Sequence, residues 1–232
     1  MTVLAIETAT TVCAAAVVRD AMVVGESSLC QKYVHAERLM GMIDEVLCQA
    51  SLSPRDVDGI AVSIGPGSFT GLRIGLSVAK GLAYSLTKPI VAVPTLESLA
   101  QRALDAGAVQ SSGFILAVLE ARREEVYCQL FQIEGNALVQ VWQARDLAIG
   151  NLVKELGSRT VTVTGEAKSK VADAVRAAGA DVNATIRCVD DALSLCSAGS
   201  VGKIGERLLR SDAAADAVTL EPLYVKEFSS SH

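Results

Sequence analysis

Histidine and aromatic residues are scarce in this chain, which has two histidines and 4% Phe, Tyr and Trp among 232 residues. A metal site with two histidine ligands on one helix needs a histidine three or four residues after His35, where Arg38 and Leu39 stand. A Ser–His–Asp triad would also have to use His35, and no serine lies in a strained G-x-S-x-G turn. The sequence therefore predicts neither site, and we interpret His35 as a helix-start or surface residue.

Clustered cations are absent as well. No basic run interleaved with aromatics occurs and the formal net charge is −5, which argues against a free-standing nucleic-acid binder because phosphate neutralisation needs clustered Lys and Arg. The six cysteines have no C-x-x-C spacing, which favours free thiols in a reducing compartment over a disulfide framework. No apolar run approaches the roughly 18 residues of a membrane span, and no basic region precedes the first strand-like segment. We expect a cytoplasmic protein without a signal peptide or membrane contact.

One order of elements is present twice. Apolar alternation and helical spacing predict βββαβαβα for residues 1–106 and again for residues 107–232, and the C-terminal tail could pack back on the first half. The expected strands are 3–7, 13–19, 22–27, 59–64, 90–93, 114–119, 126–133, 138–142, 160–164 and 186–189. The expected helices are 35–50, 72–86, 96–106, 147–156, 168–178 and 198–209. Two such α/β halves resemble the duplicated ribonuclease-H-like (actin-like, ASKHA) fold, in which a nucleotide sits in the cleft between the halves.

A glycine-rich segment, Gly65 to Gly75, joins an expected strand to an expected helix. Free backbone N–H groups at the start of a helix can hold an anion, so this layout is compatible with phosphate binding. The segment lacks the lysine of a P-loop, and the alternative is a Gly65-Pro66-Gly67 turn that simply redirects the chain. The sequence leaves both interpretations open.

An acidic residue ends the first strand of each expected half. In the ribonuclease-H-like superfamily such acids hold a metal ion, and glycine-rich turns after them touch phosphate. Here no glycine occurs among the four residues that follow either acid, and a Cβ blocks the close backbone approach that a phosphate needs. The sequence therefore indicates a vestigial cleft with Glu7, Gly65, Gly67, Ser68, Glu120 and Arg122.

The expected helix 72–86 is apolar on two sides, which predicts that it is buried on two sides. One stripe is Leu72, Leu76, Ala79 and Ala83, and the other is Ile74, Val78 and Leu82. The helix 35–50 could cover the second stripe within the chain. Since that helix also has spare apolar groups at Met40 and Met42, a helix of another subunit could cover the stripe instead.

Residues 61–83 together resemble the TsaB (YeaZ) family of bacterial tRNA threonylcarbamoyladenosine biosynthesis proteins. The resemblance continues through residues 4–10, 35–39, 120–127 and 222–225. Glu7 and Ala9 stand where the family commonly has Asp and Ser, and Glu124 stands where it usually has glycine. These departures lie in the expected cleft and weaken a nucleotide-binding role.

The resemblance implies a non-catalytic scaffold or activator subunit that pairs with TsaD, which transfers a threonylcarbamoyl group to N6 of adenosine 37 in tRNAs reading ANN codons. The ATPase TsaE would join the pair. These partners would bind ATP and the metal ion, and no cofactor is expected in this chain. The chain would contact tRNA only as part of the assembled complex. Alone, the chain could form a homodimer. By position, pairing would use the helices 35–50 and 70–86, through His35, Leu39, Met42, Ile43, Val46, Leu72, Arg73, Ile74, Leu76, Val78 and Lys80.

Two rival functions rest on the same residues. An actin-like ATPase or kinase would use Glu7 and Glu120 in the cleft, and tight Mg-ATP binding that is lost in Glu7→Gln would favour it. A metallopeptidase would use His35, and the scarcity of histidine argues against it.

Overall fold

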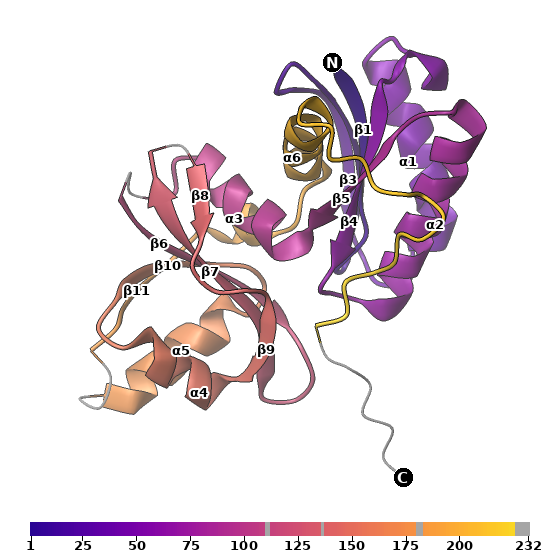
Figure 1. Ribbon diagram of the computed structural model, residues 1–232. Helices are drawn as coiled ribbons and strands as arrows, with labels where there is room; N and C mark the ends of the chain where they lie inside the picture. Colours follow the sequence, from indigo (N-terminus) through magenta and orange to yellow (C-terminus); the bar gives the residue numbers. More distant parts are fainter. Residues whose placement is uncertain (110–111, 136, 180–182, 226–232) are drawn as a thin grey trace. The chain divides into compact units, whose positions relative to one another are not determined.

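The computed structural model describes residues 1–109, 112–135, 137–179 and 183–225, and the chain divides into two compact units (Figure 1). The first unit comprises Met1–Ser98 and Cys196–Leu223, and the second comprises Leu99–Leu195 and Tyr224–His232. Each unit has its own sheet and its own buried cluster of side chains, so each is described by itself.

The first unit is built on a five-stranded sheet with the strand order β3-β2-β1-β4-β5. The pairs β1–β2 and β2–β3 are antiparallel, and the pairs β1–β4 and β4–β5 are parallel. The strands are β1 (Thr2–Glu7), β2 (Val12–Arg19), β3 (Met22–Cys30), β4 (Gly59–Gly65) and β5 (Ile90–Pro94). The helices are α1 (His35–Gln49), the 3-10 turn η1 (Pro54–Asp56), α2 (Phe69–Leu86), the start of α3 (Thr95–Asp105) and α6 (Ala198–Arg210).

Alternate residues of β1 face two different hydrophobic clusters, because successive side chains of a strand point to opposite faces. Leu4 and Ile6 belong to the cluster shared with α1 and α2, whereas Val3 and Ala5 belong to the cluster shared with α6. All six residues of β1 are buried. The sheet is therefore the middle of three layers, with α1 and α2 on one face and α6 on the other.

Helix α6 packs on β1 and β2 of the first unit, whereas the repeated order of elements in the sequence predicts it in the half 107–232. Oε1 of Glu26 on β3 holds its start by accepting hydrogen bonds from the Ser197 hydroxyl at 2.8 Å and the Gly199 N–H at 3.1 Å. Helical periodicity shows that α6 has an apolar face but does not show which sheet covers that face. These contacts correct the assignment.

The second unit has a six-stranded sheet with the order β11-β10-β6-β7-β8, and β9 also pairs with β7. Helices α4 and α5 cover one face of this sheet, around Leu116, Val118, Leu152 and Val171. The strands are β6 (Ser112–Glu120), β7 (Glu125–Glu134), β8 (Ala137–Gln140), β9 (Arg145–Ala148), β10 (Thr160–Thr164) and β11 (Thr185–Cys188). The helices are the rest of α3, α4 (Ile149–Leu156), α5 (Lys168–Ala178) and the 3-10 turn η3 (Asp191–Ser194), so most of α3 belongs to this unit although the expected helix 96–106 is assigned to the half 1–106.

The expected strands and helices agree with the observed ones to within three residues at each end, and three elements of the described residues are not expected: the strand β9 and the 3-10 turns η1 and η3. The four residues of β9 follow no clear alternation, and they are ordered by pairing with β7. The expected helix 147–156 accordingly begins only at Ile149. No helix in the described part of the chain is long and apolar enough to cross a membrane.

Candidate functional site

The glycine segment forms the end of β4 and the start of α2. Gly65 has φ +116, a conformation that residues with a side chain rarely adopt, and the Gly65–Pro66 peptide is cis. Ser68 caps α2, because its hydroxyl oxygen accepts the N–H of Gly71 at 3.3 Å. The N–H of Gly65 donates to the hydroxyl oxygen of Thr95 at 3.0 Å.

The turn after β1 covers the glycines of this segment. A Cβ at Gly67 would clash with the carbonyl oxygen of Ala9, and a Cβ at Gly71 would clash with that of Thr8. The N–H of Ser68 donates to the same Ala9 oxygen at 2.6 Å. Carbonyl oxygens repel an anion, and the N–H groups of Ser68 and Gly71 already have acceptors. These residues therefore do not fit a phosphate group, and the observed arrangement is a turn that redirects the chain.

Glu7, the last residue of β1, is fully buried. Its Oε1 accepts the N–H of Ala9 at 2.6 Å, whereas Oε2 has no hydrogen-bond partner among the described residues. Burial raises the pKa of the carboxyl group to about 7, against the opposing hydrogen bonds from Ala9, Ser63 and Thr8. Since a carboxylate binds metal only when deprotonated, a metal ion at Glu7 would have to displace this proton up to about pH 7.

Glu120 and Arg122 lie after β6 in the second unit. Glu120 is exposed, its Oε2 lies 2.8 Å from Nζ of Lys170, and its N–H donates to the Glu166 carboxylate at 3.3 Å. Arg122 is also exposed, and its carbonyl oxygen accepts the N–H of Glu125 at 3.1 Å. The acids that end β1 and β6 thus differ, because Glu7 is buried without a cation while Glu120 is paired with one.

His35 is the first residue of α1 and is buried, so of the two sequence interpretations the helix start is right and the surface position is wrong. Its Nε2 lies 3.1 Å from the carbonyl oxygens of both Thr10 and Val12. Because both partners are acceptors, Nε2 carries the hydrogen and donates. No group of three or more His, Cys, Asp or Glu residues that could hold a metal ion occurs in the described ranges.

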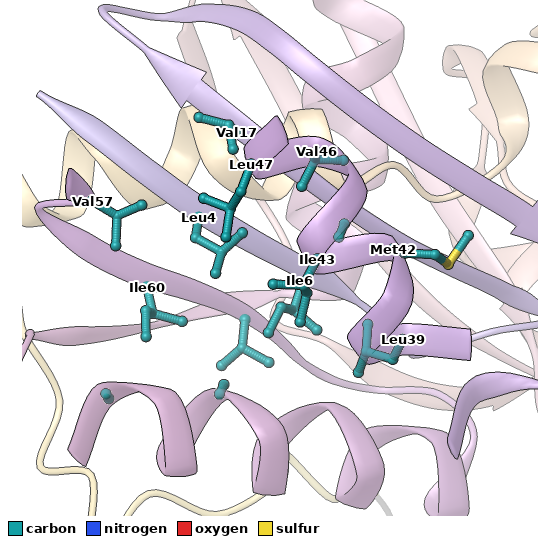
Figure 2. Close-up of a cluster of buried hydrophobic side chains, with 14 of the residues drawn as sticks. Leu4, Ile6, Val17, Leu39, Met42, Ile43, Val46, Leu47, Val57 and Ile60 are labelled. Atoms are coloured by element: carbon teal, nitrogen blue, oxygen red, sulfur yellow. The ribbon is translucent and has the colours of Figure 1, made fainter. Parts of the chain in front are cut away.

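Most of the residues expected at a partner interface lie in the core of the first unit. Figure 2 shows Leu39, Ile43 and Val46 of α1 together with Leu4 and Ile6 of β1 in one buried cluster. A folded partner cannot reach such side chains, because each helix uses its most apolar face against its own sheet. The buried ones are His35, Leu39, Met42, Ile43, Val46, Leu72 and Leu76.

The other four expected interface residues are accessible on α2. Ile74 and Val78 are half-buried at the edge of the core cluster, and Lys80 is half-buried as well. Arg73 is exposed, with its guanidinium carbon 4.0 Å from the centre of the Phe69 ring. Of the predicted contact residues, only these four can meet a partner directly.

Residues that the sequence analysis does not name complete this exposed face. Tyr84 and Phe69 on α2 are 88% and 43% exposed. Gly41 on α1 and Gly81 on α2 are exposed, and apart from the adjacent backbone of their own helix no described atom lies within 4 Å of the position that a Cβ would take. Gly41 stands opposite the buried face of α1, and Gly81 stands opposite the buried stripe of α2 that contains Leu72 and Leu76, which helical spacing alone could have revealed.

Comparison with known proteins assigns the family. The sequence model of the family described as "TsaD: tRNA N6-adenosine threonylcarbamoyltransferase" matches residues 29–226. The chain is 36% identical to the tRNA threonylcarbamoyladenosine biosynthesis protein TsaB of Bacillus subtilis over 156 residues, 67% of this chain and 66% of that protein. YeaZ from Pseudomonas aeruginosa has a TM-score of 0.80 and 25% identity, over 96% of this chain and 99% of that one. The chain belongs to the TsaD family, among its TsaB/YeaZ members.

The likeness in fold extends beyond the TsaD family. A ROK hexokinase from Thermus thermophilus has a TM-score of 0.52 at 11% identity, over 91% of this chain and 100% of that one, which shows the fold alone. The expected duplicated actin-like (ASKHA) fold and the resemblance to TsaB (YeaZ) are thus confirmed. The sequence alignment spans just under two thirds of the Bacillus subtilis TsaB, at 66% of its length.

Proposed function

We propose that this chain is a non-catalytic TsaB-type subunit in the formation of N6-threonylcarbamoyladenosine in tRNA. It pairs with a TsaD-type catalytic subunit through the exposed faces of α1 and α2, and a TsaE-type ATPase joins the pair. The partners hold ATP and the metal ion, tRNA is met through the assembled complex, and the complex works in the cytoplasm. The names of the relatives support the pathway, since the Bacillus subtilis protein is named for tRNA threonylcarbamoyladenosine biosynthesis.

The observation that carries the pairing surface is the pair of exposed glycines, Gly41 and Gly81. A glycine inside a helix is about 1 kcal/mol less favourable than alanine. Within the first unit nothing requires glycine at either position, because the space around each is open. Glycine permits another backbone to approach the helix closely, as helices do when they pack through small residues. Both glycines lie on the faces that α1 and α2 turn away from their own sheet.

Three features support a non-catalytic role. The glycines of the segment pack against the carbonyl oxygens of Thr8 and Ala9, which occupy the side on which an anion would bind. Glu7 keeps its proton up to about pH 7, because burial raises its pKa. Glu120 is neutralised by Lys170. The acids and the glycine segment thus lack the charge and the open N–H groups that phosphoryl transfer uses.

A co-purification with the TsaD-type subunit of the same organism tests the proposal. Ile74→Asp places a charge on the half-buried edge of α2, and we expect it to abolish the pairing and the modification of tRNA while the unit stays folded. The matched control is Ile186→Asp, which changes a half-buried isoleucine on β11 in the second unit and should leave the pairing unchanged.

Two outcomes would overturn the proposal. One is normal co-purification and tRNA modification by folded Ile74→Asp protein. The other is tight Mg-ATP binding by the isolated chain that disappears in Glu7→Gln, measured by calorimetry, which would favour the actin-like ATPase.

A further inference from the structure

Residues 213–223, here called the strap, run along the first unit after α6 (Figure 1). The N–H of Ala215 donates to the carbonyl oxygen of Ile90 at 2.8 Å, and that of Leu223 donates to the carbonyl oxygen of Ile64 at 2.7 Å. Ala217 and Leu220 pack against the core cluster of α1 and α2. The strap is thus tied to β4 and β5 by backbone bonds and to the core by side chains.

The middle of the strap is a closed turn built on Asp216. Its Oδ1 accepts the N–H of Val218 at 2.9 Å, and its Oδ2 accepts the hydroxyl of Thr219 at 3.2 Å. The carbonyl oxygen of Asp216 accepts the N–H of Leu220 at 2.9 Å. Nζ of Lys80 on α2 adds a hydrogen bond to the carbonyl oxygen of Val218 at 3.2 Å.

These hydrogen bonds fix the backbone so that the apolar side chain of Val218 is exposed to solvent. Val218 is 85% exposed although the backbone on both sides of it is fixed. A β-branched side chain has few rotamers, so little conformational freedom is left to lose when a partner covers it. Val218 therefore has the properties of a preorganised contact residue.

Lys80 places Val218 beside a second exposed apolar group. Tyr84 follows Lys80 by one helical turn of α2 and is 88% exposed. Phe69, Arg73, Lys80 and Tyr84 are spaced by four, seven and four residues, so they form one strip along α2. We call Lys80, Tyr84 and Val218 the rim patch. Around α2, the exposed Gly81 lies between this patch and the half-buried residues Ile74 and Val78, so both flank the face of the proposed pairing surface.

We infer that the rim patch is the outer part of the surface that receives the TsaD-type subunit, so that the strap takes part in pairing as well as the two helices. This inference rests on the proposed function. The occupant is a partner face that is apolar opposite Val218 and the Tyr84 ring and acidic opposite α2. The acidic character follows from charge, since α2 carries Arg73 and Lys80 and no acidic residue in Phe69–Leu86.

The test measures the dissociation constant between the full chain and the full TsaD-type subunit by calorimetry. Val218→Asp and Tyr84→Ala should each weaken binding at least tenfold and leave the melting temperature of the isolated chain unchanged, since both side chains are exposed. Val218→Ser serves as a milder second variant that introduces an uncharged hydroxyl and removes the apolar methyl groups. The control is Val139→Asp, which changes a 41% exposed valine on β8 of the second unit and should bind as the wild type does.

The outcomes separate this inference from the proposed function. In one outcome, Ile74→Asp abolishes binding whereas the rim variants Val218→Asp, Val218→Ser and Tyr84→Ala bind normally. The strap then has no part in pairing, so the inference is overturned while the proposed function stands. If the wild-type chain does not bind the TsaD-type subunit, the proposed function itself fails. If the rim variants lose only self-association in sedimentation and keep their affinity for the TsaD-type subunit, the patch belongs to a second copy of this chain and the inference is likewise overturned.

Discussion

The backbone N–H of Ser68 donates to the carbonyl oxygen of Ala9 at 2.6 Å, which ties the first turn of α2 to the turn after β1. Along the same side of α2, the Cα atoms of Gly71 and Gly75 face the backbone oxygen and the hydroxyl oxygen of Thr8. The start of α2 therefore rests directly on the end of β1. The glycines that resemble a phosphate cradle in the sequence serve this internal contact.

Gly75→Ala is expected to lower the free energy of unfolding by about 1–3 kcal/mol, because its methyl group would overlap Oγ1 of the buried Thr8. Urea denaturation of the isolated chain measures the change. Thr8→Ala removes a hydroxyl that has no hydrogen-bond partner in the described residues, and it also removes the obstacle. The double variant should therefore recover most of the stability that Gly75→Ala loses. Strictly additive effects would contradict the contact.

Glu7→Gln is expected to change how stability depends on pH. The pKa of Glu7 is raised from 4.5 to about 7 by burial, so between these values the folded state holds a proton that the unfolded state has released. The free energy of unfolding that Glu7 contributes is therefore fully present below about pH 4.5 and is lost as pH rises through about 7. The loss amounts to about 3 kcal/mol at about 1.4 kcal/mol per pKa unit.

The difference in unfolding free energy between wild type and Glu7→Gln isolates this group, because other titrating groups cancel in it. Denaturation series from about pH 5 to about pH 8 should show the wild type losing stability relative to the variant. A difference that stays constant over this range would mean that Glu7 is ionised in the folded state.

The sequence predicts the layers of each unit well, because the information is local. Alternation in β1 assigns Leu4 and Ile6 to one face and Val3 and Ala5 to the other, as the two clusters show. What local patterns cannot give is the partner of each face. Helix α6 has a clear apolar stripe, yet its place on the first sheet depends on long-range contacts such as Glu26 with Ser197.

The site is predicted less well than the fold, for the same physical reason. Leu39 and Leu76 are apolar residues on helices, and the sequence cannot tell a helix face buried in its own core from one left for a partner. Tyr84 is missed because one aromatic residue among polar ones carries no periodic signal. The sequence leaves open that the C-terminal tail packs back on the first half, but the path of the strap is not predictable, because it depends on bonds to Ile64, Ile90 and Lys80, which are distant in the sequence.

His35→Ala is expected to destabilise the isolated chain by about 2 kcal/mol or more, since it leaves the carbonyl oxygens of Thr10 and Val12 without their donor and opens a space in the core. His35→Phe fills the space without restoring the donor, and thus separates the two contributions. A metal chelator should not alter the melting temperature of the wild type. A chelator-dependent loss of stability would instead identify His35 as a metal ligand.

Gly41→Ala and Gly81→Ala should have opposite effects on the isolated chain and on the complex. Each replaces an exposed helix-interior glycine in open space, so each is expected to raise the unfolding free energy by about 0.5–1 kcal/mol. The same methyl groups would keep a partner helix from approaching α1 and α2, so the affinity for the TsaD-type subunit should fall. Gly150→Ala is the matched control, because Gly150 is an exposed glycine in open space on α4 of the second unit.

Denaturation of the isolated variants and calorimetry of the pair measure the two quantities on the same protein preparations. We expect Gly150→Ala to leave the affinity unchanged, whereas Gly41→Ala and Gly81→Ala weaken it, and larger side chains such as Gly81→Gln weaken it further. Stabilised variants that bind the TsaD-type subunit as tightly as the wild type would show that no backbone comes close to these glycines. The exposed faces of α1 and α2 would then have to be assigned a different role.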